Sequence, residues 1–326
     1  MIKLSEILSK IEYQSLRMGP DLEIRGLTNN SLKVERDFIF VAVKGSIFDG
    51  HKYIAEAIKA GACAIVHSED VEFVPNITYI RVENPRKSLA DLSNIITDFP
   101  SRKMDLVAVT GTNGKTTTSK LVAYLIERLF GPCANIGTDG ANVAGEIIPT
   151  SNTTPDITEI NRILTKCLDK GIKYLSLEAS SHGLDQGRLA GIDFKVGIFN
   201  NLSTEHLDYH KTMEAYFKAK MILLENSEIK VVNADDEWGQ KALNLFPDAI
   251  SFGKYDTANI RAVNIEKSEK TMTFTIDGVK FSLNTIADFE LYNNLAAIAA
   301  LKMMGASLTD ICLLYTSDAA DDLLTV

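Results

Sequence analysis

Short apolar stretches alternate with longer amphipathic ones between residues 105 and 235. The sequence predicts strands at LVAVT (106–110), CANIG (133–137), IKYLSLE (172–178), FKVGIFN (194–200) and IKVVNAD (229–235). It predicts helices from about Thr116, from about Thr158 and within 212–225. Apolar strands separated by helices are typical of a parallel sheet covered on both faces. Ligands bind such sheets beyond the carboxyl ends of the strands, so we expect the chemistry at that edge.

The first hundred residues show the same alternation on a smaller scale. Strand patterns at 39–45, 63–68 and 77–82 surround a helical pattern at 51–62, and a second amphipathic helix is expected at 88–99. The polar stretch from Pro100 to Lys103 is the best linker. We therefore predict an α/β fold class, with a small N-terminal α/β domain over 1–103 and a central domain over 104–311.

The pattern changes to a period of two after about residue 255. The stretches NIRAVNIE (259–266), TMTFTIDG (271–278) and VKFSLNTI (279–286) predict a small antiparallel sheet, with a hairpin turn at Asp277 and Gly278. A helix is expected from Asp288 to Leu308. Residues 312–326, CLLYTSDAADDLLTV, show no period and no cap, and resemble the in-frame translation of a sequencing-library adapter. We expect this tail to be non-native and the natural protein to continue.

Charge and cysteine usage narrow the class of protein. The chain of 326 residues is 45% hydrophobic and has a net charge of -9, which argues against a nucleic-acid or membrane-surface binder because both partners are polyanions. No stretch is apolar enough to predict a membrane span or a secretory signal. The four cysteines are scattered and fit neither a disulfide framework nor a zinc site. These features favour a cytoplasmic protein.

A glycine turn joins the strand at 106–110 to the following helix. The stretch TGTNGKTTT (110–118) would place free backbone N–H groups at a helix N-terminus, add the charge of Lys115, and offer the Thr116 hydroxyl to Mg²⁺. The common phosphate-loop spacing would need a glycine where Val109 stands. The alternative is an ordinary strand-to-helix turn with an exposed lysine, which leaves two glycines and three threonines unexplained.

Possible metal ligands follow the next strands. Glu178 ends a predicted strand and should project from the same sheet edge as the glycine turn. His182, His206 and His210 fall just past the next two strand ends. From the residues alone, Glu178 is equally consistent with an ordinary strand-end carboxylate, and His206 could be a capping histidine.

Several motifs together resemble the Mur ligase family. They are TGTNGKTTT, TSNTTPD (150–156), LEASSHGLDQGRL (177–189), NLSTEHLDYH (201–210), YFKAK (216–220) and VVNADD (231–236). The resemblance covers residues 1 to about 311 and is greatest to the members that add the third residue of the peptidoglycan stem peptide. The shortened glycine loop is normal in this superfamily, which also contains folylpolyglutamate synthetase.

The resemblance implies that ATP phosphorylates a substrate carboxylate and that an amine then attacks the acyl phosphate. Lys115 and two Mg²⁺ ions would neutralise the anions that meet in this transfer. Thr116 and Glu178 would hold one metal, and His206 would help to hold the second. Lys220 would be carbamylated, which turns its cation into an oxygen ligand; without the resemblance it reads as a solvated lysine.

The resemblance also implies residues for ATP and for a UDP-N-acetylmuramoyl-dipeptide substrate lying across the two domains. The ATP residues are Gly111, Thr112, Asn113, Gly114, Lys115, Thr116, Thr117 and Asn293. The substrate residues are Ser31, Asn152, Thr153, Thr154, Ser180, Gln186 and Arg188. Arg188 is equally consistent with a surface ion pair. The family commonly has Asp and Arg where this chain has Asn30 and Leu32, and Asn where it has Glu290.

The expected partners are thus ATP, UDP-MurNAc-dipeptide and an amino acid, with Mg²⁺ as cofactor, no nucleic acid and a monomeric state. Alternatives are another Mur-type or folylpolyglutamate-type amide ligase, or a nucleotide-binding relative without ligation. In the family a C-terminal domain closes over ATP and selects the amino acid. Since that domain is absent from residues 1–326, we expect these residues to bind ligands but to ligate weakly.

Overall fold

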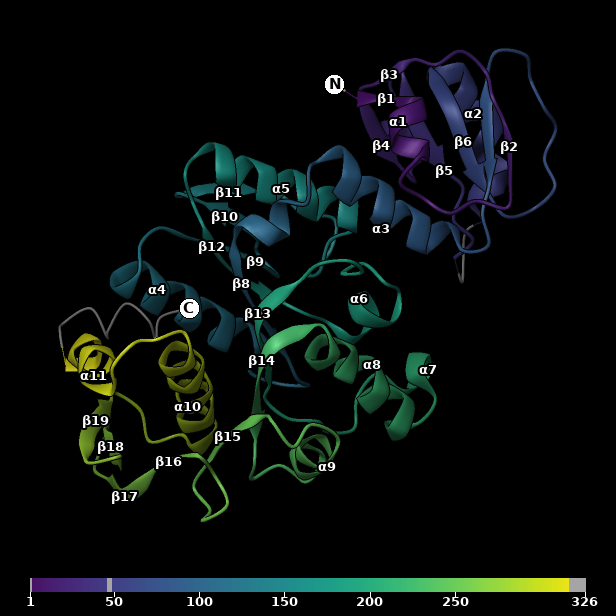
Figure 1. The fold of residues 1–326 in the computed structure, drawn as a ribbon. Coiled ribbons are helices and arrows are strands. Elements are labelled where there is room, and N and C mark those ends of the chain that lie inside the picture. The colour runs from purple at the N-terminus through teal and green to yellow at the C-terminus, as the bar shows by residue number, and fades with distance from the viewer. Residues whose placement is uncertain (1, 46–48, 317–326) are drawn as a thin grey trace. The chain divides into compact units, whose positions relative to one another are not determined.

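The computed structural model describes residues 2–45 and 49–316, and these fold into two compact units (Figure 1). The N-terminal unit contains Met1–Pro100 together with Asp156–Thr165 and Gly187–Gly191. The second unit contains Ser101–Pro155, Lys166–Gln186 and Ile192–Val326. The main division falls next to the predicted linker. The return of two later segments to the N-terminal unit was not predicted.

The described part of the N-terminal unit is built on a five-stranded sheet in the order β2-β7-β6-β5-β4. Its strands are β2 (Ser15–Arg17), β4 (Gly26–Thr28), β5 (Phe38–Val41), β6 (Ala62–His67) and β7 (Thr78–Arg81), and only the β2–β7 pair is antiparallel. Two further strands, β1 (Ile2–Lys3) and β3 (Glu23–Ile24), pair with each other. The helices are α1 (Leu4–Leu8), α2 (Ile54–Ala60) and α3 (Pro85–Ile96), with short 3₁₀ turns η1 (Ser31–Lys33), η2 (Gly50–Tyr53) and η3 (Pro100–Lys103).

Helix α3 begins three residues before the expected position. The Asn84 side chain accepts a hydrogen bond from the Lys87 amide, and Pro85 occupies the first helical turn, where its missing N–H costs nothing. The cap and the proline therefore start the helix, although the apolar period alone becomes visible only at Ser88.

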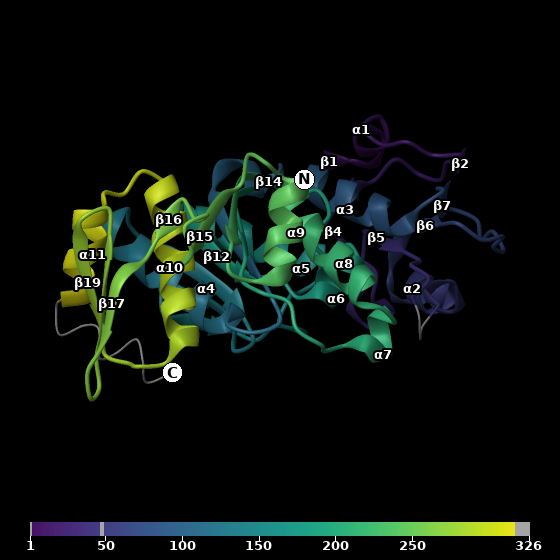
Figure 2. The same ribbon diagram turned by 90° about the horizontal axis from the view of Figure 1, so that it is seen from below.

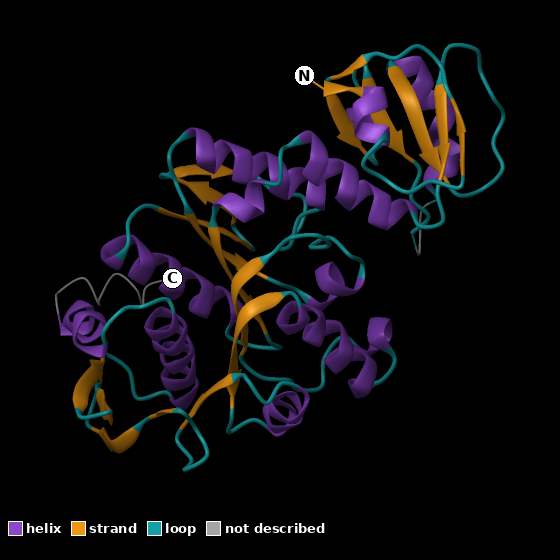
Figure 3. Cartoon of the chain, viewed as in Figure 1, coloured by secondary structure: helices purple, strands orange, loops and turns teal. Residues whose placement is uncertain are grey.

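A nine-stranded sheet forms the centre of the second unit as far as it is described, in the order β11-β10-β9-β12-β8-β13-β14-β15-β16 (Figure 3). The strands are β8 (Asp105–Thr110), β9 (Cys133–Gly137), β10 (Gly140–Val143), β11 (Glu146–Ile148), β12 (Tyr174–Glu178), β13 (Phe194–Phe199), β14 (Ser227–Asn233), β15 (Ile250–Gly253) and β16 (Ile260–Arg261). From β9 to β16 all pairs are parallel, and β10 and β11 add an antiparallel edge. The mainly parallel sheet predicted from the sequence is confirmed.

Helices cover both faces of this sheet (Figures 1 and 2). On one face α4 (Lys115–Leu129) packs against α10 (Asp288–Met303), and Val109 and Ile198 point into their shared core. On the other face α8 (Met213–Glu225) and α9 (Glu237–Leu245) pack on β13 and β14 around Phe199. The remaining helices are α5 (Ile157–Asp169), α6 (Ser181–Asp185) and α7 (Leu207–His210).

The predicted small antiparallel sheet is present as β17 (Val263–Lys267), β18 (Met272–Ile276) and β19 (Val279–Leu283). Asp277 and Gly278 both have positive φ, at 46° and 84°, as expected for a tight hairpin turn. One expectation for this region is wrong: Ile260 and Arg261 pair with β15 in the large sheet and not with the small one.

The region after β19 also differs from the prediction. The expected helix over 288–308 ends at Met303, and a separate helix α11 (Leu308–Thr316) follows. The Ser307 hydroxyl caps α11 by accepting the Asp310 amide at 3.1 Å, and Ile311 and Tyr315, one turn apart, are buried. Residues 312–316, which were expected to begin a tail without secondary structure signals, thus continue helix α11. The rest of the predicted tail, 317–326, lies outside the described residues.

No helix within 2–45 and 49–316 is both long and apolar enough to cross a membrane.

Candidate functional site

The glycine turn between β8 and α4 has a conformation that only glycine adopts without strain. Gly114 has φ of +82°, and a Cβ added there would overlap the Asn293 side-chain oxygen. At Gly111 an added Cβ would lie 3.1 Å from Cβ of Asn200. The close approach of β13 and α10 to this loop explains both glycines.

Asn201, which follows β13, fastens the glycine loop. Its side-chain oxygen accepts hydrogen bonds from the amides of Thr112 and Asn113 at 3.1 and 2.9 Å, and its amide donates to the Asn113 carbonyl at 3.2 Å. Two of the N–H groups expected to face an anion are thus paired with Asn201 in this structure. The first amides of α4 remain at a helix N-terminus, where the macrodipole favours negative charge.

Two lysines converge on one carbonyl of the loop. The Gly111 oxygen accepts from Lys115 Nζ at 3.1 Å and from Lys220 Nζ at 2.7 Å, although Lys220 comes from α8 on the other face of the sheet. Lys220 is 1% exposed, and burial together with the charge of Lys115 holds the pKa of its amine well below the usual value. Burial also lowers the pKa of Lys115, while nearby Glu178 acts in the opposite direction. Lys220 is therefore a buried amine inside the site and not the solvated lysine of the alternative interpretation.

Thr116 and Glu178 meet at the sheet edge. The Thr116 hydroxyl donates to one Glu178 carboxylate oxygen at 2.8 Å, and the Thr138 amide donates to the other at 2.9 Å. The carboxylate fits because β9 ends in Gly137, where an added Cβ would overlap its oxygen. A hydroxyl and a buried carboxylate are the hard oxygen donors that Mg²⁺ prefers, so this pair fits a magnesium ion.

The three histidines gather beside Lys220. The His182 ring lies 4.9 Å from that of His206 and 5.5 Å from that of His210, and His206 is 6.0 Å from Tyr216, between ring centroids. Lys220 Nζ lies 4.6 Å from the centroid of the same Tyr216 ring. His206 begins α7 with φ of +55° and makes no side-chain capping bond, so the capping alternative does not hold.

Two predicted substrate residues of the second unit have structural hydrogen bonds. The Thr154 hydroxyl is buried, donates to the Glu178 carbonyl at 2.8 Å and accepts the Ser180 amide at 2.9 Å. The Ser180 hydroxyl in turn caps α6 by accepting the Gly183 amide at 3.1 Å. In this structure the bonds of the Thr154 hydroxyl fix the backbone around Glu178, and its contact with a substrate stays a prediction.

The other predicted residues are more dispersed. Asn152 is exposed and Thr153 is half-buried, with its hydroxyl 3.4 Å from that of Thr138. Gln186 donates to Tyr209 at 3.4 Å. Ser31 and Arg188 belong to the N-terminal unit.

Asn293 contacts the glycine loop and its helix. Its side-chain oxygen accepts from the Thr118 hydroxyl at 3.3 Å, and the side chain is buried against Gly114. It is placed to support the loop from α10.

The structure thus brings Lys115, Thr116, Glu178, Lys220 and His206 to one edge of the large sheet. Within the described residues, no group of three or more His, Cys, Asp or Glu side chains could hold a metal ion. Sequence reasoning missed Asn201, Thr138 and Tyr216. Asn201 and Thr138 follow parallel strands directly, which is the one signal that could have indicated them.

Comparisons with known proteins show which family this chain is similar to. A family model described as "Mur ligase middle domain" matches residues 109–301, and one described as "Mur ligase family, catalytic domain" matches residues 23–97. A Fusobacterium nucleatum protein named UDP-N-acetylmuramoyl-L-alanyl-D-glutamate--2,6-diaminopimelate ligase is 37% identical over 94% of this chain. A Clostridium acetobutylicum protein with the same name, numbered 2, is 34% identical over 97% of it.

A solved structure titled as the same kind of ligase superposes with a TM-score of 0.82 at 27% identity and covers 96% of this chain. The chain spans only part of each of these proteins: 64% of the Fusobacterium protein, 67% of the Clostridium protein and 66% of the solved chain.

Proposed function

The chain belongs to the Mur ligase family, and from this premise we propose that it is the nucleotide- and substrate-binding part of an ATP-dependent ligase. The ligase adds the third amino acid to UDP-N-acetylmuramoyl-L-Ala-D-Glu. The convergence of Lys115, the Thr116–Glu178 pair and buried Lys220 around the glycine loop carries this proposal. The names of the relatives make 2,6-diaminopimelate the first amino acid to assay.

In the first step, an oxygen of the D-Glu carboxylate attacks the γ-phosphorus of ATP, the bond to the β,γ-bridging oxygen breaks, and ADP leaves. In the second step, the amine attacks the acyl carbon, inorganic phosphate leaves and the amine loses a proton. In this proposal the charge of Lys115 stabilises the oxygens of the transferred group, and the amides at the start of α4 orient them. Bound Mg²⁺ would add charge neutralisation, held by Thr116 and Glu178 on one side and by His206 and carbamylated Lys220 on the other.

The surroundings of Lys220 favour the carbamate. Burial and Lys115 favour its neutral amine, which is the form that attacks CO₂. The nitrogen forms a bond to carbon, one proton is released, and a carboxylate replaces the ammonium. The positive charge of Lys115 then stabilises the new anion where it previously opposed a second cation.

The remaining ligand contacts are proposed as follows. The loop from Gly111 to Thr117 binds the phosphates, and Asn293 supports it. Asn152, Thr153, Gln186 and Arg188, together with Ser31, bind the UDP-sugar peptide, whereas Thr154 and Ser180 shape the backbone beside Glu178. The enzyme acts as a cytoplasmic monomer.

Trapping the acyl phosphate with hydroxylamine tests this proposal without the incoming amino acid. Residues 1–326 with ATP, Mg²⁺ and UDP-MurNAc-L-Ala-D-Glu should yield a hydroxamate. UDP-MurNAc-L-Ala, which lacks the reacting carboxylate, and a Lys115→Ala variant should yield none. Hydroxamate formation with a folate in place of the UDP-sugar peptide would favour a folylpolyglutamate-type ligase. Binding of both ligands with no hydroxamate would contradict catalysis by these residues.

A further inference from the structure

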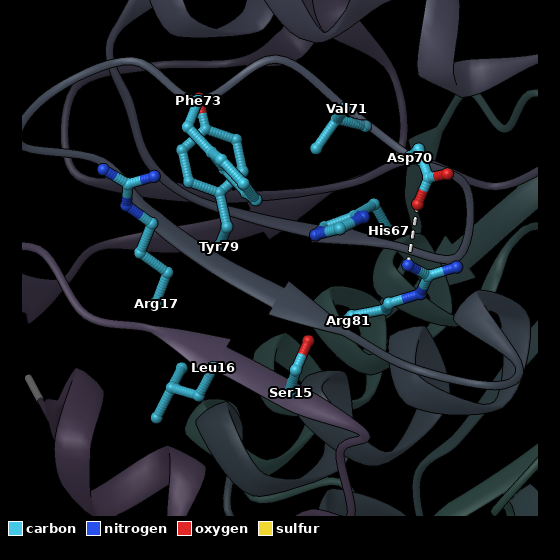
Figure 4. A pocket seen from close by; sticks show the side chains of 9 residues that line it. All are labelled: Ser15, Leu16, Arg17, His67, Asp70, Val71, Phe73, Tyr79 and Arg81. Atoms are coloured by element: carbon cyan, nitrogen blue, oxygen red, sulfur yellow. Dashed lines mark hydrogen bonds and ion pairs between the residues drawn. The ribbon is translucent and has the colours of Figure 1, made fainter.

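The N-terminal unit contains a pocket of about 430 Å³ that the ligase chemistry does not use (Figure 4). It lies on the β2–β7–β6 side of the five-stranded sheet, beneath the segment that joins β6 to β7. Ser31 follows β4, at the opposite edge of this sheet, so the pocket is separate from the predicted sugar-nucleotide residue. Its volume lies within the roughly 300–1,000 Å³ that small-molecule sites occupy.

His67 presents an unpaired acceptor to the pocket. The side chain is 4% exposed, and its Nδ1 lies 2.8 Å from the Glu69 carbonyl oxygen, which can only accept, so Nδ1 carries the hydrogen. Burial lowers the pKa of His67, which leaves the ring neutral and Nε2 with a lone pair. Among the described residues Nε2 has no hydrogen-bond partner. Nε2 can therefore accept a hydrogen bond from a ligand or a water in the pocket.

Two guanidinium groups make the pocket attractive to anions. Arg81 is held by Asp70, with 2.8 Å between Nη1 and the carboxylate oxygen. Arg17 lies over the Phe73 ring, 4.7 Å from its centroid, and within the described residues it has no carboxylate partner. Two positive groups thus face one carboxylate, in a chain whose net charge is -9. A guanidinium without a carboxylate is ready for fork-like bonding to a ligand carboxylate or phosphate.

Aromatic rings form the apolar part of the lining. Phe73 and Tyr79 meet edge to face with 4.9 Å between centroids, and the Tyr79 hydroxyl accepts the Val74 amide at 3.0 Å. Figure 4 shows these rings on one side of the cavity, with Arg17 beside them and His67 and Arg81 across from Arg17. Flat rings next to guanidinium groups suit a planar ligand.

We propose that this pocket binds a small aromatic anion: a planar ring with a carboxylate or phosphate at one end for Arg17, and an O–H or N–H donor at the other end for Nε2 of His67. The three requirements come from three different sets of contacts.

A matched set of probes tests the proposal in the unmodified protein. 4-Hydroxybenzoate has the ring, the charge and the donor; benzoate lacks the donor, and 4-hydroxybenzamide lacks the charge. Binding is followed by calorimetric titration, and in the unmodified protein the ¹⁵N resonance of His67 Nε2 moves when a donor engages it. We expect saturable binding of 4-hydroxybenzoate and about tenfold weaker binding of each of the other two. 4-Hydroxyphenyl phosphate in place of the benzoate distinguishes a phosphate ligand from a carboxylate ligand.

Variants assign the contacts. Arg17→Met should weaken 4-hydroxybenzoate about tenfold, whereas Arg25→Met, which changes an exposed arginine next to β4, should leave it unchanged. His67→Gln should remove the preference for 4-hydroxybenzoate over benzoate.

Four results would overturn the proposal: no saturable shift of Nε2 with any anionic probe, equal binding of the neutral amide, equal losses in the two arginine variants, or displacement of the probe by UDP. The first three deny the recognition chemistry, and the last makes the pocket part of the sugar-nucleotide site. None of these results bears on the acyl phosphate assay, so the two proposals fail independently.

Discussion

The two halves of the candidate site are built differently. Thr116 and Glu178 lie at the start of a helix and the end of a buried strand, and their side chains already touch at 2.8 Å. His206 lies in a connection, in a left-handed backbone conformation, with 43% of its side chain exposed. Lys220, its proposed partner, is buried on a long helix.

The difference teaches that the side chains of the Thr116–Glu178 half are preorganised, whereas those of the His206–Lys220 half are not yet arranged for a ligand. The Thr116–Glu178 half needs only its ligand, because helix, strand and glycine positions fix it. In our proposal the His206–Lys220 half also needs the carbamate on Lys220. Thr112 connects the halves: its hydroxyl accepts the Ser203 amide at 2.9 Å and lies 3.3 Å from the Tyr216 hydroxyl.

The largest effect is expected from distorting the preorganised half. Gly114→Ala should weaken ATP binding by about 100-fold, since its Cβ would overlap Asn293 and displace the loop. Gly145→Ala is the matched control, because Gly145 has nearly the same φ, +81° against +82°, with nothing within 4 Å. Both variants should lose about 1–2 kcal/mol of stability from backbone strain. Calorimetric titration with ATP and urea unfolding measure the two effects; equal ATP affinities would remove the special role of Gly114.

Removing the Thr116 hydroxyl should show how much a metal ion held by Thr116 and Glu178 contributes to ATP affinity. Thr116→Val should reduce the gain in ATP affinity caused by Mg²⁺ by roughly 10- to 100-fold and leave binding without Mg²⁺ nearly unchanged. Thr116→Ser keeps the hydroxyl and should behave like the unmodified protein. Titrations at several Mg²⁺ concentrations provide the measurement. A valine variant with a normal Mg²⁺ response would show that the hydroxyl does not bind the ion.

Removing the Asn201 hydrogen bonds that hold the glycine loop should weaken ATP binding less than the two preceding substitutions. Asn201→Ala removes three hydrogen bonds to Thr112 and Asn113 and should weaken ATP binding about tenfold, with faster amide exchange over 111–117. Asn142→Ala is a suitable control because Asn142 bonds a turn amide, that of Gly145, away from the site. Unchanged exchange in the Asn201 variant would mean that the loop holds its shape without this side chain.

The smallest effect concerns the histidines beside Lys220. Burial and the neighbouring His182 lower the pKa of His210, so the unfolded chain binds more protons than the folded one below pH about 6.5. The free energy of unfolding should fall as the pH drops below that value. His210→Gln should flatten the fall by less than about 1 kcal/mol between pH 7.5 and 5.5, as measured by urea unfolding. An unchanged slope would show that another group causes the pH dependence.

The elements and the sheet edge were predictable because they follow from local rules. Apolar strands such as 106–110 and 172–178 could only be buried, and the strand ends at Thr110 and Glu178 therefore had to lie at the same edge. The glycines and Lys115 predicted a phosphate loop by residue type alone. The proposed role of Lys220 could not be predicted from its position in the sequence. It was inferred from the resemblance to the Mur ligase family.

Side-chain direction was not predictable. Thr154 was expected to face a ligand, yet its hydroxyl bonds the backbone at Glu178 and Ser180, which depends on a chain path that no local pattern encodes. Asn201 was overlooked because an asparagine after a strand is common in ordinary turns. Helix α11 was overlooked because its period is visible in only two buried residues, Ile311 and Tyr315.

Gly137 has a consequence for how this sequence can diverge. Because the Glu178 carboxylate fills the place of its missing Cβ, even alanine at 137 would force the acid out of its position. A side chain at 137 would require the Glu178 carboxylate to take another position. A descendant with such a side chain could keep the fold, but its carboxylate would lie differently from the arrangement that fits a cation here.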